Sequence, residues 1–359
     1  MGGILKRTTL DKVLLAFRFP ALFTQTGDWF KRRLSNVSAQ TNRLQLKYSK
    51  MYMSKNLQAV VNGIIGDTLV AAHHPLAIQM TLNIRGQTLI LEQHLLKISI
   101  PKIQSKLVVL VHGICMSDDH WPEDLFVPQD AISVSLHYNT GRHISTNGQE
   151  LSALLEKLVS HWPVPVTDIV LIGSSLGGLV SRSASYYGAL AGHGWLQLLS
   201  RLVFIGTPHH GSPLERRGNW VDTRLSSNRY TAYLARLGKM RSAGITDLRY
   251  GYLLDSDWYG RDRFEPLADN RQPVALPDGV VCYALAATMG KRAGDLSDRF
   301  MGDGLVPLES ALGYHHRKEI CLSFHQMHQW IGFGMHHMEL LNHPMMYDQI
   351  KSWLASPIT

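Results

Sequence analysis

The feature that most constrains the fold of this chain is a serine held between glycines at the end of a short apolar strand. Residues 168–178 read D-I-V-L-I-G-S-S-L-G-G, which places the pattern G-x-S-x-G around Ser175. Gly173 and Gly177 relieve the clashes that larger side chains would make in so tight a strand-to-helix turn. A serine in such a turn is strained and exposes its hydroxyl, which is typical of a nucleophile that attacks a carbonyl carbon. The structural alternative is an ordinary glycine-rich turn.

Apolar segments of strand length alternate with helical segments on both sides of this turn. A hairpin is predicted over 80–91, around the turn residues Arg85, Gly86 and Gln87. The alternation that follows predicts a mostly parallel central sheet flanked by helices on both faces, an α/β fold. The predicted strands are 106–111, 132–137, 168–172, 201–205, 280–286 and 319–324, and the predicted helices are 148–161, 176–190 and 344–354.

Two segments break the alternation. Residues 1–78 mix apolar and basic residues without strand periodicity, so we expect a helical basic N-terminal extension. Residues 79–359 are then the catalytic domain. Within it, 213–275 is rich in Arg, Asp, Tyr and Trp and has no clear strand, which is typical of an inserted lid or cap.

A serine nucleophile needs donors for the oxyanion, and in parallel sheets such groups gather at the carboxyl ends of the strands. The strand 106–111 is followed by His112, Gly113 and Ile114. Gly113 allows the backbone to approach a substrate closely. The N–H groups of Ile114 and Leu176 are the candidate oxyanion donors. His112 precedes the serine, outside the chain order Ser…Asp…His, so we interpret it as scaffold of the oxyanion loop and not as the base.

The acid and the base are expected after the last strands. Asp303 lies between two glycines in M-G-D-G-L-V-P and is the candidate acid, with Asp295 and Asp298 as alternatives. A histidine-rich loop precedes the last helix, and His337 is the candidate base, preferred over His336. The order from Ser175 to Asp303 to His337 leaves room for the lid before the acid.

With these segments in view, the chain resembles the lipase/esterase branch of the α/β-hydrolases, especially class 2 lipase-like and GPI-inositol-deacylase-like proteins. The segments that carry the resemblance are L-V-H-G-I (110–114), I-G-S-S-L-G-G (172–178), G-T-P-H-H-G-S (206–212), G-D-G-L-V-P (302–307) and H-M-E-L-L (337–341). They span roughly 107–354, and residues 1–100 carry none of them.

The resemblance implies an α/β-hydrolase fold with Ser175 as nucleophile, Asp303 as acid and His337 as base. It also implies that Thr207, Pro208 and His209 belong to a strand-end loop near the substrate pocket. We count these three, together with His112 and Gly113, as candidate substrate-binding residues.

The positive charge is concentrated at the N-terminus. The chain has a net charge of +8, and residues 1–55 hold eleven Lys and Arg against two Asp. The rest of the chain is therefore close to neutral. A basic segment can contact an anionic membrane surface, or it can be a solvated helical extension. No aromatic-interleaved or zinc-finger pattern accompanies it, so nucleic acid is not an expected partner.

Cysteine usage and the N-terminal pattern suggest a compartment. Three widely spaced cysteines form no disulfide framework, which favours a reducing environment. The apolar stretch 13–23 is broken by Arg18 and Pro20, unlike a signal peptide. We expect a cytoplasmic protein, with peripheral membrane association as an option. His209 and His210 are adjacent and no H-E-x-x-H pattern supports them, so neither a metal nor a cofactor is expected.

Together these features predict hydrolysis of a carboxylic ester through an acyl-enzyme, with a hydrophobic ester or acyl-lipid as substrate and a role in lipid metabolism. A thioesterase, acyltransferase or amidase on the same triad stays open, because the lid and pocket choose the leaving group. A non-catalytic binding protein of the same fold is the remaining alternative.

Overall fold

The computed structural model describes residues 54–100, 102–122, 126–212, 241–264, 268–291 and 302–357. Most of the basic segment 1–55, much of the predicted lid 213–275, and the alternative acids Asp295 and Asp298 lie outside these ranges.

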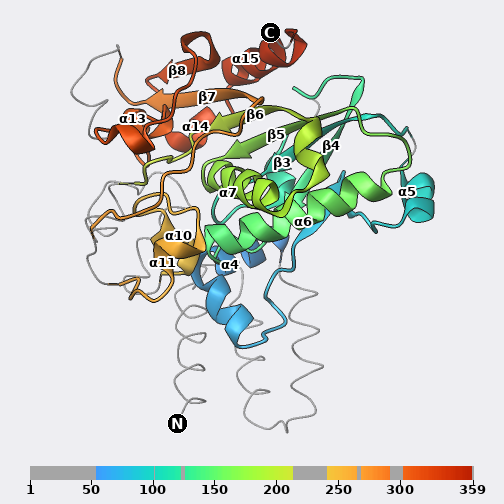
Figure 1. Ribbon diagram of the computed structural model, residues 1–359, viewed down its shortest axis with the longest axis horizontal. Helices are drawn as coiled ribbons and strands as arrows, with labels where there is room; N and C mark the ends of the chain where they lie inside the picture. The colour runs from blue at the N-terminus through green and yellow to red at the C-terminus, as the bar shows by residue number, and fades with distance from the viewer. Residues whose placement is uncertain are drawn as a thin grey trace, which may run out of the picture.

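The described residues form one eight-stranded sheet with the order β2-β1-β4-β3-β5-β6-β7-β8 (Figure 1). Strands β3 to β8 run parallel to one another, and β1 is antiparallel to both of its neighbours. The strands are β1 (Thr81–Ile84), β2 (Gln87–Thr88), β3 (Lys106–Val111), β4 (Ala131–His137), β5 (Asp168–Ser174), β6 (Leu199–Ile205), β7 (Val281–Thr288) and β8 (Gln329–Phe333).

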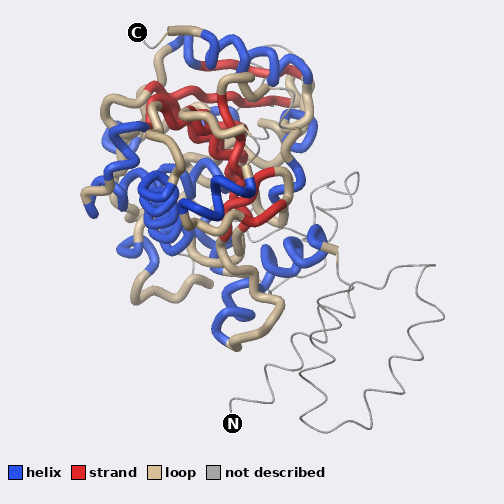
Figure 2. Tube along the Cα trace, turned by 90° about the vertical axis from the view of Figure 1, so that its right-hand side faces the viewer, coloured by secondary structure: helices blue, strands red, loops and turns tan. Residues whose placement is uncertain are grey.

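Helices cover both faces of this sheet (Figure 2). One face packs against α6 and α7, and the other against α14 and α15. Successive residues of the inner strands alternate between the two cores, which explains why these strands are apolar throughout. The helices are α4 (Lys55–Ala71), α5 (Gln93–Ser99), α6 (Ile144–His161), α7 (Leu176–Ala191), α10 (Ala243–Asp247), α11 (Asp255–Trp258), α13 (Leu308–Ala311), α14 (His337–Leu340) and α15 (Pro344–Ala355).

Most predicted elements are confirmed with small changes in their ends, but the strand expected at 319–324 is wrong. That segment begins in a 3₁₀ helix, Lys318–Ile320, and the last strand of the sheet is β8. The prediction failed because apolar residues alternate in this segment, as in a strand, and Ile320, Leu322 and Phe324 are indeed buried. Their burial comes from packing, and Leu322 N–H donates to Gly313 O of a turn instead of pairing with a sheet neighbour.

Helix α4 lies outside the sheet and its two covering layers. It buries an apolar stripe that forms a small core of its own, which includes Cys115 from the loop after β3. None of the helices in the described part of the chain has the length and hydropathy to span a membrane. The division of the chain at residue 78 stays a prediction.

Candidate active site

Ser175 occupies the turn between β5 and α7, as the sequence predicts. Its φ is +50°, a left-handed backbone that is rare for a residue with a side chain. A Cβ on Gly173 would lie only 2.6 Å from the backbone of Gly178, so the turn needs glycine there. Ser175 N–H donates to Ile205 O at 2.7 Å, which ties the strained turn to the end of β6. Tertiary contacts thus hold the strain in place.

The structure brings His337 and Asp303 together. His337 is the first residue of α14, and its Nδ1 lies 2.7 Å from Asp303 Oδ2. The other carboxylate oxygen accepts the N–H groups of Leu305 and Val306, at 3.0 and 2.8 Å. Both side chains are buried. By contrast, His336 is exposed and serves as the N-cap of α14, so of the two candidate bases only His337 faces the acid.

The carboxylate controls the charge of the imidazole. Burial on its own would lower the pKa of His337, but the charge of Asp303 and its hydrogen bond outweigh burial and raise that pKa above the ordinary value. Because Nδ1 donates to Asp303 in the neutral ring, the lone pair is on Nε2, the atom that a base must use. The pair therefore fixes both the tautomer and the orientation of His337.

His337 also lies beside the segment that holds Ser175. A Cβ on Gly206 would lie 3.0 Å from His337 Cε1, and the preceding residue, Ile205, accepts the N–H of Ser175. Ser175 and His337 thus contact adjacent residues, Ile205 and Gly206, at the end of β6. No hydrogen bond joins Ser175 Oγ to His337 among the described contacts. In catalytic sites this bond often forms only when substrate is bound.

The loop after β3 approaches Ser175 as well. A Cβ on Gly113 would lie 3.2 Å from Ser175 Cβ, so the backbone of this loop lies against Ser175. Leu176 is the first residue of α7, and an N–H in that position has no partner within its helix. The two backbone segments that carry the candidate oxyanion donors, Ile114 and Leu176, therefore both lie beside Ser175.

His112 is built into the loop after β3 with its ring buried. It is fully buried, and burial lowers the pKa of its imidazole to about 3, so the ring is neutral. Its Nδ1 contacts Gly113 O at 2.9 Å, while Tyr138 donates its hydroxyl to His112 O at 2.7 Å. The role of His112, as scaffold of this loop or as a contact to substrate, stays a prediction.

The loop after β6 holds a charge cluster that the sequence analysis missed. Thr207 packs against Gly178, and His209 is buried with its Nδ1 3.4 Å from a guanidinium nitrogen of Arg182. Arg271 reaches the same loop and donates to His210 Nδ1 at 3.0 Å. Burial and these cations lower the pKa of His209 well below the usual value. The one available signal was an arginine, Arg182, within the apolar start of a helix.

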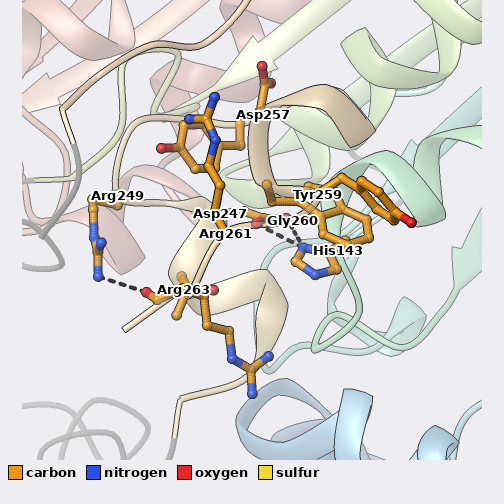
Figure 3. Close-up of a pocket in the computed structure, with 11 residues that line it drawn as sticks. His143, Asp247, Arg249, Asp257, Tyr259, Gly260, Arg261 and Arg263 are labelled. Atoms are coloured by element: carbon orange, nitrogen blue, oxygen red, sulfur yellow. Dashed lines mark hydrogen bonds and ion pairs between the residues drawn. The ribbon is translucent and has the colours of Figure 1, made fainter. Parts of the chain in front are cut away.

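A cavity of about 280 Å³ opens in the described part of the predicted lid and not at Ser175 (Figure 3). Its walls come mainly from α10, α11 and the residues after them. His143, the N-cap residue of α6, also lines the cavity and stacks on Trp258 with 3.6 Å between the ring centres. Asp247 contacts His143 Nδ1 at 3.0 Å. Ser175, Asp303 and His337 do not line this cavity.

Comparison with known proteins identifies the fold. Residues 135–271, a stretch that contains the turn around Ser175, match the family described as PGAP1-like alpha/beta domain. The chain has an α/β-hydrolase fold. The α/β-hydrolase fold that the resemblance implies is thereby confirmed. No curated protein sequence matches the chain.

Similar solved structures come from lipases and esterases of distant sequence. The mature lipase BlEst2 of Bacillus licheniformis is 18% identical, with a TM-score of 0.45 over 71% of this chain and 94% of that one. Lipase B of Aspergillus fumigatus is 11% identical, with a TM-score of 0.45 over 78% and 57%. An esterase of Pyrobaculum calidifontis is 14% identical, with a TM-score of 0.42 over 85% and 95%.

The described residues contain no group of three or more His, Cys, Asp and Glu side chains arranged to hold a metal ion.

Proposed function

We propose that this chain is a serine hydrolase that cleaves carboxylic esters through a Ser175–His337–Asp303 triad. The observation that carries the proposal is the buried hydrogen bond of 2.7 Å between His337 and Asp303, next to a serine in a left-handed turn. The three residues are far apart in the sequence and come from three different loops at the carboxyl edge of the sheet. A purely structural turn would need neither the acid nor the base.

In the first half of the reaction, His337 Nε2 takes the proton of Ser175 Oγ as that oxygen attacks the acyl carbon. The N–H groups of Ile114 and Leu176 stabilise the oxyanion that forms on the carbonyl oxygen. As the C–O bond to the leaving alkoxide breaks, His337 returns the proton to it, and the acyl group stays on Ser175. Asp303 holds the ring and stabilises its protonated form throughout.

In the second half, a water molecule attacks the acyl-enzyme with His337 again as base. The carboxylic acid leaves and Ser175 recovers its proton. Thr207, Pro208 and His209 in the loop after β6, together with His112 and Gly113 in the loop after β3, stay candidate substrate-binding residues.

The substrate class that fits is a hydrophobic ester or acyl-lipid, met at or near a membrane by a cytoplasmic enzyme. The support is the basic composition of residues 1–55. We expect the protein to bind vesicles that contain anionic lipid, and to bind them less as salt rises because the charges are screened. Binding that persists unchanged after deletion of residues 1–53 would refute the membrane contact.

A fluorophosphonate probe tests the nucleophile. The wild type is expected to be labelled and Ser175→Ala is not, with turnover of p-nitrophenyl esters falling roughly 10⁴- to 10⁶-fold because the triad acts as a unit. Ser174→Ala is the matched control, since it removes the neighbouring hydroxyl only. Labelling that persists in Ser175→Ala would refute the assignment of Ser175 as the nucleophile.

A panel of short-chain and long-chain p-nitrophenyl esters, thioesters and amides separates the alternatives on the same triad, and a product assay separates hydrolysis from acyl transfer. Absence of both labelling and turnover would instead favour a non-catalytic binding protein.

A further inference from the structure

Helix α4 contacts the loop that follows β3 directly, backbone to backbone. A Cβ on Gly63 would overlap Cys115 Sγ and would lie 3.0 Å from Cys115 N and Cα. Cys115 is the residue after Ile114, the candidate oxyanion donor. It is buried, and its Sγ lies 3.9 Å from Val60 O, one turn earlier on α4. The backbone of Gly63 therefore packs directly against Cys115, with no room for a side chain on the helix at this point.

Cys115 is strained in the same way as Ser175. Its φ is +60°, and only four non-glycine residues in the described ranges have a positive φ. A residue with a side chain keeps this conformation only where its surroundings enforce it. Cys115 N–H donates to Thr140 Oγ1 at 3.2 Å on one side, and α4 closes the other side. The orientation of the Ile114–Cys115 backbone is thus set by contacts outside the sheet.

The same loop is attached to the N-terminal end of α4. Lys55 Nζ lies 2.7 Å from Asp118 and 2.8 Å from Asp119. Ser117 donates its hydroxyl to Asn56 Oδ1 at 2.8 Å. Asp118 is buried, and it also accepts from Asn83 at 2.7 Å, so the pairing extends into the sheet.

The middle and the C-terminal half of α4 are attached to the cap, next to α10 (Figure 1). Ser242 donates its hydroxyl to Gly63 O at 2.6 Å, and Asp67 accepts the N–H of Ala243 at 3.1 Å. Arg263 of the cap also pairs with Asp67. One helix thus fixes the oxyanion loop relative to the cap, and it does so from a part of the chain that shares no motif with the hydrolase segments.

We propose that α4 is a positioning element for catalysis, and that Gly63 acts through Cys115 to aim the N–H of Ile114 at the oxyanion. This inference rests on the proposed function. A helix that merely covered the fold would stabilise it without affecting the transition state. A helix that sets the direction of a donor affects kcat more than KM, because the oxyanion exists only in the transition state.

The decisive variant is Gly63→Ala, whose methyl group must displace Cys115. We expect kcat for a p-nitrophenyl ester to fall roughly 10- to 100-fold, less than the 10²- to 10³-fold cost of losing a donor outright. KM should change by about twofold or less. Gly188→Ala is the matched control: it also crowds a helix, against Ser152 and Leu196, but at the far end of α7. It should leave kcat unchanged at a temperature where both variants are folded.

A second-site change tests the route through Cys115. In Gly63→Ala/Cys115→Gly the sulfur that the new methyl group overlaps is gone, and glycine accepts a positive φ without strain. Gly63→Ala should therefore lower kcat less in the Cys115→Gly background than it does in the wild type. An equal fall in both backgrounds would overturn the proposal, as would a folded Gly63→Ala with wild-type kcat.

If Gly63→Ala does not fold, Asn56→Ala decides. Asn56 is exposed, and the change removes only its hydrogen bond to Ser117, so we expect a fall in kcat of about two- to tenfold, the equivalent of one hydrogen bond. An unchanged kcat would then refute the proposal. Fluorophosphonate labelling of wild-type Ser175 keeps the two proposals apart: if it is absent, the triad fails, whereas if it is present with unaffected α4 variants, only the role of α4 fails.

Discussion

Two groups of buried histidines lie close to the carboxyl edge of the sheet, and their neighbours give them opposite properties. His337 faces the carboxylate of Asp303, which raises the pKa of its imidazole despite full burial. His209 and His210 face Arg182 and Arg271. Burial and these cations lower the pKa of both rings, that of His210 to about 3. Burial is common to the two groups, so the sign of the neighbouring charge decides whether a histidine can take up a proton.

The difference bears on function because a general base must gain and lose a proton near neutral pH. His337 can do so. His209 and His210 stay neutral, and we interpret them as rigid parts of the loop after β6, where His210 Nε2 lies 2.8 Å from Gly313 O. A histidine pair in a sequence motif is thus no guide to a role until its neighbours are known.

The largest expected effect comes from removing the carboxylate. In Asp303→Asn the amide can donate to His337 Nδ1 and favour the wrong tautomer, so we expect kcat to fall about 10⁴-fold. The pKa of His337 should also drop. Since the protonated ring cannot act as a base, wild-type activity is lost as pH falls through the raised pKa. In the variant, the acid limb of the pH–rate profile, where activity falls with pH, should move to lower pH. Rate profiles and a histidine NMR titration measure both.

Asp247→Asn is the matched control for that experiment. Asp247 is another buried carboxylate 3.0 Å from a histidine, His143, but it lies in the predicted cap segment and not at Ser175. Its loss should leave the acid limb of the activity profile where it is. If the acid limb stayed in place in Asp303→Asn, or moved equally in both variants, Asp303 would not be the group that raises the pKa of His337. The contrast between the two histidine groups would then be wrong.

A smaller effect is expected on stability in acid. The pKa of His210 is lowered on folding, so between about pH 6.5 and 3 the unfolded chain binds more protons than the native one, and stability falls as pH falls. His337 has the opposite sign, because the stability gained from its raised pKa is lost as pH rises through the folded value.

In His210→Gln we therefore expect the urea midpoint to decline less steeply from pH 6.5 towards 4 than in the wild type, whatever the absolute stability of the variant. The same change at exposed His94 controls for the loss of one histidine. If the urea midpoint declined in parallel in all three proteins, the lowered pKa of His210 would not contribute to the pH dependence of stability.

Much of the fold was predictable because its signals are local. The apolar runs of β3 and β5 are continuous because both faces of these strands are covered, and the glycines around Ser175 mark a turn that other residues cannot form. The strand expected at 319–324 was wrong for a related reason. Alternating apolar residues do not show which strand a segment pairs with, and β8 was found only through its pairing with β7.

The sequence by itself determined most of the sheet and the turn at Ser175, because these depend on apolar runs and on backbone sterics, and it gave the chain order of the candidate acid and base. Only the tertiary structure decided that His337 and not His336 meets Asp303, that arginines surround His209, and that α4 holds the loop at Cys115. These are contacts between residues distant in the sequence. Their energies depend on distance, burial and the sign of neighbouring charges, none of which is a property of a local pattern.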